Sequence, residues 1–255
     1  MVAKLVLDQL EKTGGTLTPL TLPSTNATTG QYLKNDGSGG LGWVDAPVVA
    51  GFHNVKFITS STNPVGLTSG TTLIVVEVQG AGGCSGGSDG SAYYGGTGGS
   101  GGYSMMQLSV ADTSTFNVVV GAGGVDGTAQ RDGTDSQFIQ VIGSELGSTI
   151  TAGGGGGTAD PPGSHGDGGT GGTVTNTNTP VENRINITGS NGVRGGPGGQ
   201  AGRDSHWGLG GSRASSTNGA GVAGTGYGSS GSDPMGASQL GGAGAPGLVV
   251  IWEYK

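Results

Sequence analysis

Glycine recurs with a period of three in three separate tracts of this chain. The tracts read Gly-Gly-X over residues 95–102, 168–173 and 195–200. A period of three matches neither the α-helix, with 3.6 residues per turn, nor the β-strand, with two. It matches the polyproline-II helix, which has three residues per turn. Two faces of such a helix carry no side chain here, so the triplets predict polyglycine-II helices whose backbones bond to antiparallel neighbours.

The composition excludes a conventional hydrophobic core along the whole chain. Of 255 residues, 61 are glycine, while apolar residues make up 32% and aromatic residues 5%. Such a composition alone is typical of disorder, because glycine loses much backbone entropy on ordering. The triplet register and the strand patterns between the tracts indicate an ordered fold instead. Collagen is excluded because the tracts are short and the chain has only 10 prolines.

Residues 1–50 differ in composition from the remainder. Threonine and leucine alternate along residues 16–23, which predicts an extended segment. A turn signal at 35–37 separates the apolar pairs 32–33 and 43–44, and this arrangement predicts a hairpin. So few apolar residues cannot form a core of their own. We therefore expect this segment to attach the chain to another protein or to trimerise with its own copies.

Residues 51–255 combine strand patterns with the glycine tracts. The expected strands are 54–59, 72–79, 104–110, 116–120, 136–142, 148–152 and 247–254. Strands are thus expected within 52–151 and 247–254, and polyglycine-II tracts mainly within 80–103 and 152–247. No segment shows the apolar spacing of a helix. The predicted fold is mostly β plus polyglycine-II, with a β-sandwich-like module that carries a layered stack of glycine helices.

The charge and the cysteine content limit the classes of partner that we expect for this chain. The net charge is −7 and lysine and arginine do not cluster, so nucleic acid is not expected as a partner. No stretch of about 18 apolar residues exists, so we expect no membrane insertion. The chain has one cysteine, Cys84, which we interpret as a small buried residue.

No pattern in the sequence predicts catalysis. The aspartates between the tracts neighbour glycine, serine or proline, as is typical of turns. His53, His165 and His206 lie far apart without metal-ligand spacing, and no glycine tract ends in the Lys-Ser/Thr of a phosphate loop. We therefore expect no enzyme activity, no bound metal and no cofactor.

Six linkers interrupt the glycine tracts: 85–94, 125–135, 158–165, 174–190, 203–217 and 227–239. Loops on a rigid scaffold are where binding sites concentrate, and aromatic side chains there supply contact area at low entropic cost. The candidate receptor-binding residues are Tyr93, Tyr94, His165, His206, Trp207 and Tyr227. Alternatively, such aromatic side chains form a small core that caps the ends of the glycine layers. For Trp207 both interpretations stay open, and for Tyr103 the small core is favoured.

Antiparallel helices place successive linkers at opposite ends, so only about half of the six linkers can reach one receptor. Our hypothesis places Trp207, Tyr94 and His165 together at one end of the stack.

Five pieces of the sequence recur in one order in a known group of proteins. They are residues 72–83, which end in Gln-Gly-Ala-Gly-Gly, and residues 98–104, 118–124, 150–156 and 244–251. Together they resemble the glycine-rich domains of bacteriophage tail fibres. The segment 22–44, with Thr-Thr-Gly-Gln-Tyr-Leu and Gly-Leu-Gly-Trp, is similar to the short β repeats of trimeric phage fibres.

Within that group the layout resembles the distal tail-fibre adhesins of T-even-like phages. The resemblance implies a virion protein at the tail fibre or tail tip. Its N-terminal part would attach to another tail-fibre or baseplate protein, and its glycine-stack loops would bind a host receptor, either an outer-membrane protein or a surface glycan. The shaft-like residues 1–50 depart from that layout, which leaves a homotrimer open beside a single copy on the fibre. The alternatives are a structural fibre or collar protein, an ice-binding protein and a polysaccharide depolymerase.

Overall fold

A computed structural model shows an all-β chain, with no helix among the residues that it describes. These residues are 9–10, 20–21, 23–29, 31–35, 38, 40–45, 51–88, 94–111, 113–128, 130–142, 149–159, 165–177, 184–215, 219–236 and 238–255. The chain divides into two compact units, residues 1–50 and 51–255, and each is described by itself. The attachment and trimerisation roles assigned to the first unit stay predictions.

Two short antiparallel pairs form the described part of the first unit. They are β1 (Gln9–Leu10) with β2 (Leu20–Thr21), and β3 (Gln31–Asn35) with β4 (Leu41–Asp45). The second pair confirms the predicted hairpin, because Leu33 lies opposite Trp43. The indole N–H of Trp43 donates a hydrogen bond to the carbonyl oxygen of Thr25 at 2.6 Å, so the hairpin also holds the chain that leads into it.

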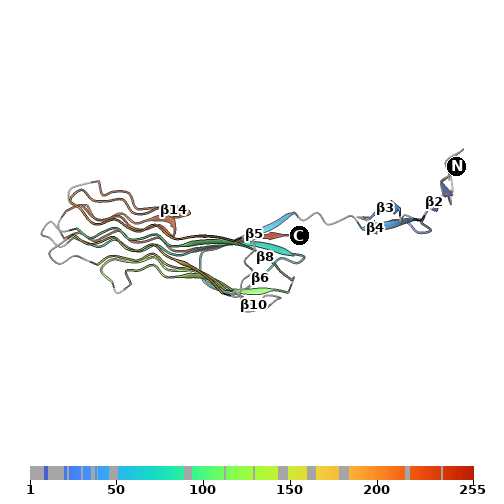
Figure 1. Cartoon of the computed structure of the whole chain (residues 1–255), viewed down its shortest axis with the longest axis horizontal. Helices are drawn as coiled ribbons and strands as arrows, with labels where there is room; N and C mark the ends of the chain where they lie inside the picture. The colour runs from blue at the N-terminus through green and yellow to red at the C-terminus, as the bar shows by residue number, and fades with distance from the viewer. Residues whose placement is uncertain are drawn as a thin grey trace, which may run out of the picture. The chain divides into compact units, whose positions relative to one another are not determined.

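Two five-stranded antiparallel sheets form one end of the second unit (Figure 1). The first sheet has the order β13-β8-β7-β16-β5, and the second has the order β12-β11-β10-β9-β6. The bounds in the first sheet are β5 Phe52–Ile58, β7 Leu73–Gln79, β8 Tyr103–Ser109, β13 Arg184–Ile187 and β16 Leu248–Tyr254. Those in the second sheet are β6 Thr62–Gly66, β9 Thr115–Val119, β10 Ser136–Ile142, β11 Thr149–Ala152 and β12 Val174–Thr177.

The hydrophobic core lies between these two sheets. Ile74 and Val76 from β7 and Ile251 from β16 are fully buried there, and the stacked rings of Phe116 and Phe138 lie 4.5 Å apart. Alternate residues of each strand point to this interface, because the side-chain period of a strand is two. The sandwich predicted from the sequence is therefore confirmed.

Five strands of the second unit lie where the sequence did not predict any. β6 is an edge strand of the second sheet, and β12 and β13 lie within 174–190, a range whose sequence predicts a linker. β14 (Trp207–Leu209) and β15 (Thr225–Tyr227) pair with each other inside the range assigned mainly to glycine tracts. These strands are three to five residues long, so their alternation was too brief to separate from a linker pattern.

Glycine-rich segments continue from the sheet strands and run side by side to the opposite end of the unit (Figure 1). We call the described residues of 80–102, 121–135, 153–173 and 188–247 the glycine block. We call the end of the glycine block that adjoins the strands its sheet end, and the opposite end its far end. Thus 80–88 leads away from β7, and 94–102 returns to β8.

Backbone hydrogen bonds in the glycine block repeat every third residue. Along 80–86, the N–H groups of residues 80, 83 and 86 donate to the segment 96–102. Residues 81 and 84 donate to the segment 131–134, and residues 82 and 85 donate to the segment 242–245. A β-strand has two hydrogen-bonded neighbours, whereas this segment donates to three. The period of three is the one that the glycine triplets predict; the polyglycine-II helix type itself stays a prediction.

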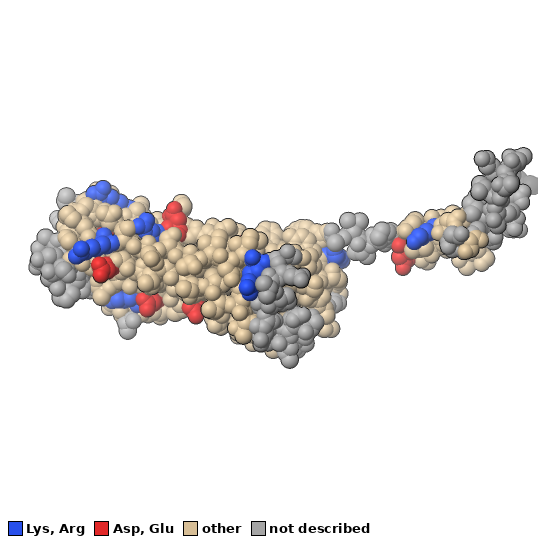
Figure 2. Space-filling view, viewed as in Figure 1, with Lys and Arg blue, Asp and Glu red and all other residues tan. Residues whose placement is uncertain are grey.

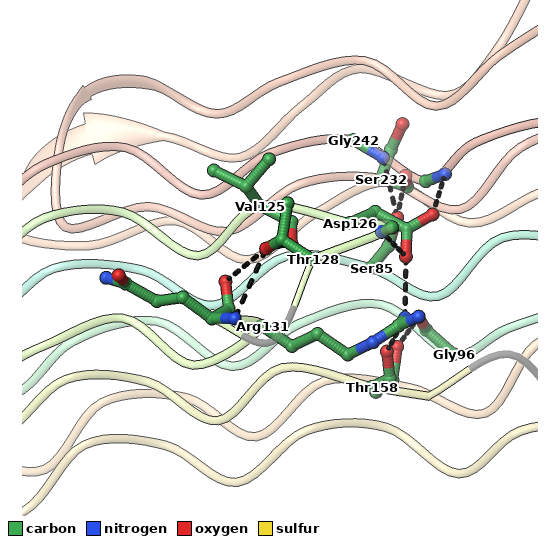
Figure 3. Close-up of polar contacts among 12 residues, drawn as sticks. Ser85, Gly96, Val125, Asp126, Thr128, Arg131, Thr158, Ser232 and Gly242 are labelled. Atoms are coloured by element: carbon green, nitrogen blue, oxygen red, sulfur yellow. Dashed lines mark hydrogen bonds and ion pairs between the residues drawn. The ribbon is translucent and has the colours of Figure 1, made fainter.

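A buried polar network crosses the glycine block (Figure 3). Asp126 pairs with Arg131 at 2.5 Å, and its other carboxylate oxygen accepts a hydrogen bond from the Gly241 N–H at 2.7 Å. The Arg131 guanidinium also donates to the carbonyl oxygen of Thr158 at 2.9 Å. The Thr158 hydroxyl donates in turn to the Gly96 carbonyl oxygen at 2.6 Å. The network therefore joins four segments of the glycine block through side-chain polar groups.

Asp233 is a fully buried carboxylate in the same block. It accepts a hydrogen bond from the backbone N–H of Gln200, while its second oxygen has no partner. Burial raises the pKa of Asp233 to about 6, and the hydrogen bonds and the charge of Arg213 oppose this rise only in part. The native state therefore holds this proton more tightly than the unfolded chain does.

We expect Asp233 to destabilise the fold as the pH rises from about 4 to about 6. Between its unfolded and native pKa values the native state binds more protons, so the free energy of unfolding falls with rising pH. At about 1.4 kcal/mol per pKa unit, the loss amounts to about 3 kcal/mol. Denaturant unfolding of the native chain and of Asp233→Asn across this range should show the variant gaining relative stability. Parallel pH curves would contradict the prediction.

Candidate functional site

Two groups of aromatic side chains contain the residues singled out from the sequence. One lies at the far end of the glycine block, and the other lies at its sheet end, against the first sheet. A whole glycine segment, 94–102, separates them along the chain. They are therefore two distinct places on the molecule.

Tyr94 and His165 form the far-end pair. An isolated β-bridge joins Ser88 to Tyr94, where the segment that leaves β7 meets the one that returns to β8. The rings of Tyr94 and His165 are nearly parallel, at 10°, with centroids 5.8 Å apart. The Tyr94 backbone N–H also donates to His165 Nδ1 at 3.3 Å. Both side chains are half-buried, so the pair is rigid but still accessible.

Charged groups surround this pair. The Arg194 guanidinium donates to the carbonyl oxygen of His165 at 3.4 Å and lies 3.9 Å from the carboxylate of Asp167. Both charged side chains are exposed, at 64% and 95%. Figure 2 shows basic and acidic side chains together over this half of the glycine block, next to a middle region with few charges on the same face. The far end can thus offer a ring face and charges of both signs to a ligand.

Tyr93, the remaining candidate of this group, lies outside the described residues.

Glu77 organises the second group. Its carboxylate, on β7, accepts hydrogen bonds from the Trp252 indole at 2.7 Å, the Tyr103 hydroxyl at 2.8 Å and the Trp207 indole at 3.1 Å. The residue is only 8% exposed. Three donors to one carboxylate compensate for the loss of hydration that burial imposes on the charge. We call Glu77 and these three donors the Glu77 cluster.

The ring of His206 extends the Glu77 cluster toward solvent. It stacks on Tyr103 with centroids 4.1 Å apart, and its side chain is 47% exposed. Its Nε2 atom lies 4.0 Å from the Glu77 carboxylate. Burial, and then the hydrogen bond to Glu77, raise the pKa of Tyr103 well above its usual range, so this hydroxyl stays a donor at neutral pH. Tyr103 therefore belongs to a small core, as the sequence favoured.

Trp207 does not join Tyr94 and His165 at one end, so that part of the hypothesis is wrong. Its ring packs edge-on against Phe57 of β5, with centroids 6.4 Å apart, and its indole reaches Glu77 on β7. The chain turns at 205–208, where the Ser205 N–H donates to the Gly208 carbonyl oxygen, and this turn places Trp207 against the first sheet. The side chain is half-buried. Trp207 therefore lies in a small core against the first sheet, as the alternative interpretation of this residue expected.

Tyr227 lies opposite Trp207 in the β14–β15 pair and is also half-buried. The hydroxyl of Ser205 donates to its carbonyl oxygen, which ties β15 to the turn that carries His206 and Trp207. Three of the six candidates therefore come together at the sheet end.

The described residues contain no group of three or more metal-ligating side chains that could hold an ion. Cys84 is fully buried, and burial, together with the charge of Asp126, raises the pKa of its thiol to about 11. The thiol is therefore protonated at neutral pH and is a poor nucleophile. In the described part of the chain no helix is long and apolar enough to cross a membrane.

Glu77 is the organising residue that the sequence analysis missed. Its signal was a single carboxylate inside the apolar run Leu73–Gln79, at a position whose neighbours on the same face are Val75 and Gln79. A charged side chain within such a strand is expected to have hydrogen-bonding or ionic partners, because unpaired charges are almost never fully buried. The partners themselves come from β8, β14 and β16, which lie far away in the sequence.

One family of known proteins matches most of the second unit. The model of the glycine-rich domain family matches residues 58–254, which is most of the chain. The chain belongs to this family. The match covers the glycine block and every strand of both sheets except β5, of which it includes only Ile58. No curated protein matches the chain.

Proposed function

We propose that this glycine-rich domain protein is a bacteriophage tail-fibre or tail-tip adhesin that binds a host cell-surface receptor through the far end of its glycine block. The observation that carries the proposal is the Tyr94–His165 pair. It presents a stacked, half-exposed ring surface where the chain reverses, on a scaffold held by backbone hydrogen bonds. Rigid aromatic anchors lose little entropy when they bind a protein or a glycan.

The resemblance of the sequence to phage tail-fibre domains supports the same proposal. In it, residues 1–50 attach the chain to another fibre or baseplate protein, or trimerise with two further copies. The receptor is an outer-membrane protein or a surface glycan of a bacterium. The mass of the purified chain in solution distinguishes a homotrimer from a single copy.

We expect Tyr94→Ala combined with His165→Ala to weaken cell binding at least about tenfold, because removing a central anchor costs about 2 kcal/mol or more. The assay uses the fluorescently labelled full chain and flow cytometry on a panel of Gram-negative strains. The native chain should bind a subset of strains saturably.

Tyr254→Ala is the matched control, because Tyr254 also pairs with an aromatic ring, that of Phe52, but on the first sheet. It should bind as the native chain does, and all variants should melt within a few degrees of one another. Equal binding by the double variant would contradict the far-end assignment. Absence of binding to every strain would favour the alternative, a structural fibre or collar protein.

A further inference from the structure

A half-enclosed pocket of about 150 Å³ opens at the sheet end of the glycine block. One wall is formed by Ser100 and by residues 188–190, which belong to two neighbouring glycine segments. The turn 204–206 and the ends of β8 and β13 also line the pocket. The pocket is separate from the far end, so an inference about it does not rest on the proposed function.

The polar groups of the pocket include both donors and acceptors. One carboxylate oxygen of Asp204 accepts a hydrogen bond from the Gly210 N–H at 2.8 Å, while the other has no donor among the described residues. Thr188 and Ser190 also line the pocket and are exposed, and each hydroxyl can donate one hydrogen bond and accept others. These groups are thus available to a ligand without breaking a bond of the fold.

The apolar part of the pocket is a ring and an aliphatic side chain. His206 lines the pocket while it stacks on the buried Tyr103, so its ring is held in place. Ile187, at the end of β13, also lines the pocket and is 48% exposed. A ligand that enters would therefore meet an aromatic ring and an aliphatic side chain as well as hydroxyl and carboxylate groups.

The charged groups at the pocket limit the class of ligand that it can bind. Among the described residues that line the pocket there is no lysine or arginine and one carboxyl group, that of Asp204. The Glu77 carboxylate lies 4.0 Å from Nε2 of His206. This arrangement disfavours an anion. Pockets for small molecules combine an apolar face with a few placed polar groups, and the volume here suits a ligand of about one sugar ring.

We propose that this pocket binds one neutral sugar residue. The C–H face of the sugar ring lies against His206 and Ile187, and two neighbouring sugar hydroxyls donate to Asp204. The hydroxyls of Thr188 and Ser190 bond to the remaining sugar oxygens. A hydroxyl that donates to a carboxylate forms a stronger hydrogen bond than a neutral pair, so Asp204 is expected to contribute most.

The test is saturation-transfer NMR on the full chain with the methyl glycosides of glucose, galactose, mannose and N-acetylglucosamine. At least one should bind saturably, in the millimolar range that is usual for so small an interface. Asp204→Asn keeps an oxygen for the Gly210 N–H but removes the charge, and it should weaken binding at least about tenfold. Thr188→Val keeps the shape, removes one hydroxyl and should weaken binding severalfold.

Asp135→Asn is the matched control, because Asp135 is also an exposed aspartate that accepts a hydrogen bond from a glycine N–H, that of Gly154 at 3.1 Å, but does not line the pocket; this variant should bind as the native chain does. The methyl glycoside of glucuronic acid should bind more weakly than that of glucose because Asp204 repels its carboxylate. Absence of saturable binding for every neutral glycoside would overturn the proposal. Binding that Asp204→Asn and Thr188→Val leave unchanged would overturn it too, because the sugar would then lie elsewhere.

Discussion

Gly99→Ala is expected to destabilise the protein by at least about 3 kcal/mol, near the upper end of the cost of overpacking. The added methyl carbon would lie 2.0 Å from the carbonyl oxygen of Thr170, which no rotamer can avoid. The same glycine donates its N–H to the carbonyl oxygen of Gly156 and accepts a hydrogen bond from the N–H of Gly83. Moving the backbone to relieve the clash therefore disturbs two further segments.

Gly196→Ala is the matched control in the glycine block. Its added carbon would meet only the side-chain amide of Gln200, at 3.9 Å, which is ordinary contact. In differential scanning calorimetry we expect Gly99→Ala to melt about 6–12 °C below the native chain, at about 2–4 °C per kcal/mol for a domain of this size. Gly196→Ala should melt close to the native chain. Equal melting temperatures for the two variants would show that the close backbone approach does not limit stability.

Glu77→Gln is expected to cost about 3 kcal/mol although it preserves the shape of the side chain. The amide keeps one acceptor oxygen but turns the other into a donor, which then faces the donors of the Glu77 cluster. Trp207 and Tyr103 donate to one oxygen and Trp252 to the other, so either orientation of the amide leaves at least one N–H or O–H group unpaired. An unsatisfied buried group costs about 1–3 kcal/mol, and the charge-assisted bonds are lost as well.

A double-mutant cycle with Trp207→Phe measures this coupling. Phenylalanine removes the indole N–H but keeps a ring against Phe57. We expect Trp207→Phe to cost less in the Glu77→Gln background than in the native one, because the partner group is already impaired. Denaturant unfolding followed by circular dichroism gives all four stabilities. Asp167→Asn, a carboxylate-to-amide change at a 95% exposed side chain, should change the stability little; additive costs in the cycle would contradict the assigned role of Glu77.

Much of the second unit follows from local patterns. The run Leu73–Gln79 and the final run Leu248–Tyr254 were expected as strands, and they lie side by side at the centre of the first sheet. The two segments with the clearest strand pattern thus form the most buried strands. The edge strands β12 and β13 are only four residues long and have no buried residue, and so their sequences resemble linkers.

The candidate site, too, could be predicted from the sequence only in part. The sequence singled out the aromatic side chains, but it could not assign them to ends, because a glycine segment reverses wherever its neighbours permit. Tyr94 and His165 are brought together across 71 residues, and Trp207 is taken to the opposite end by a turn that Ser205 and Gly208 close. Asp204 and Thr188, which face the pocket, carried no signal distinct from ordinary turn and strand residues.

The sequence by itself determined the period of three, the absence of helix from the described chain and the places of the main strands, because these depend on side-chain spacing within one segment. Only the tertiary structure decided which segments are neighbours, which aromatics share an end and where Glu77 finds its three donors. The physical reason is that bare glycine faces bond through backbone groups, which are the same at every residue. Specificity of pairing therefore comes from the sheets that anchor the segments and from a few buried polar side chains such as Asp126.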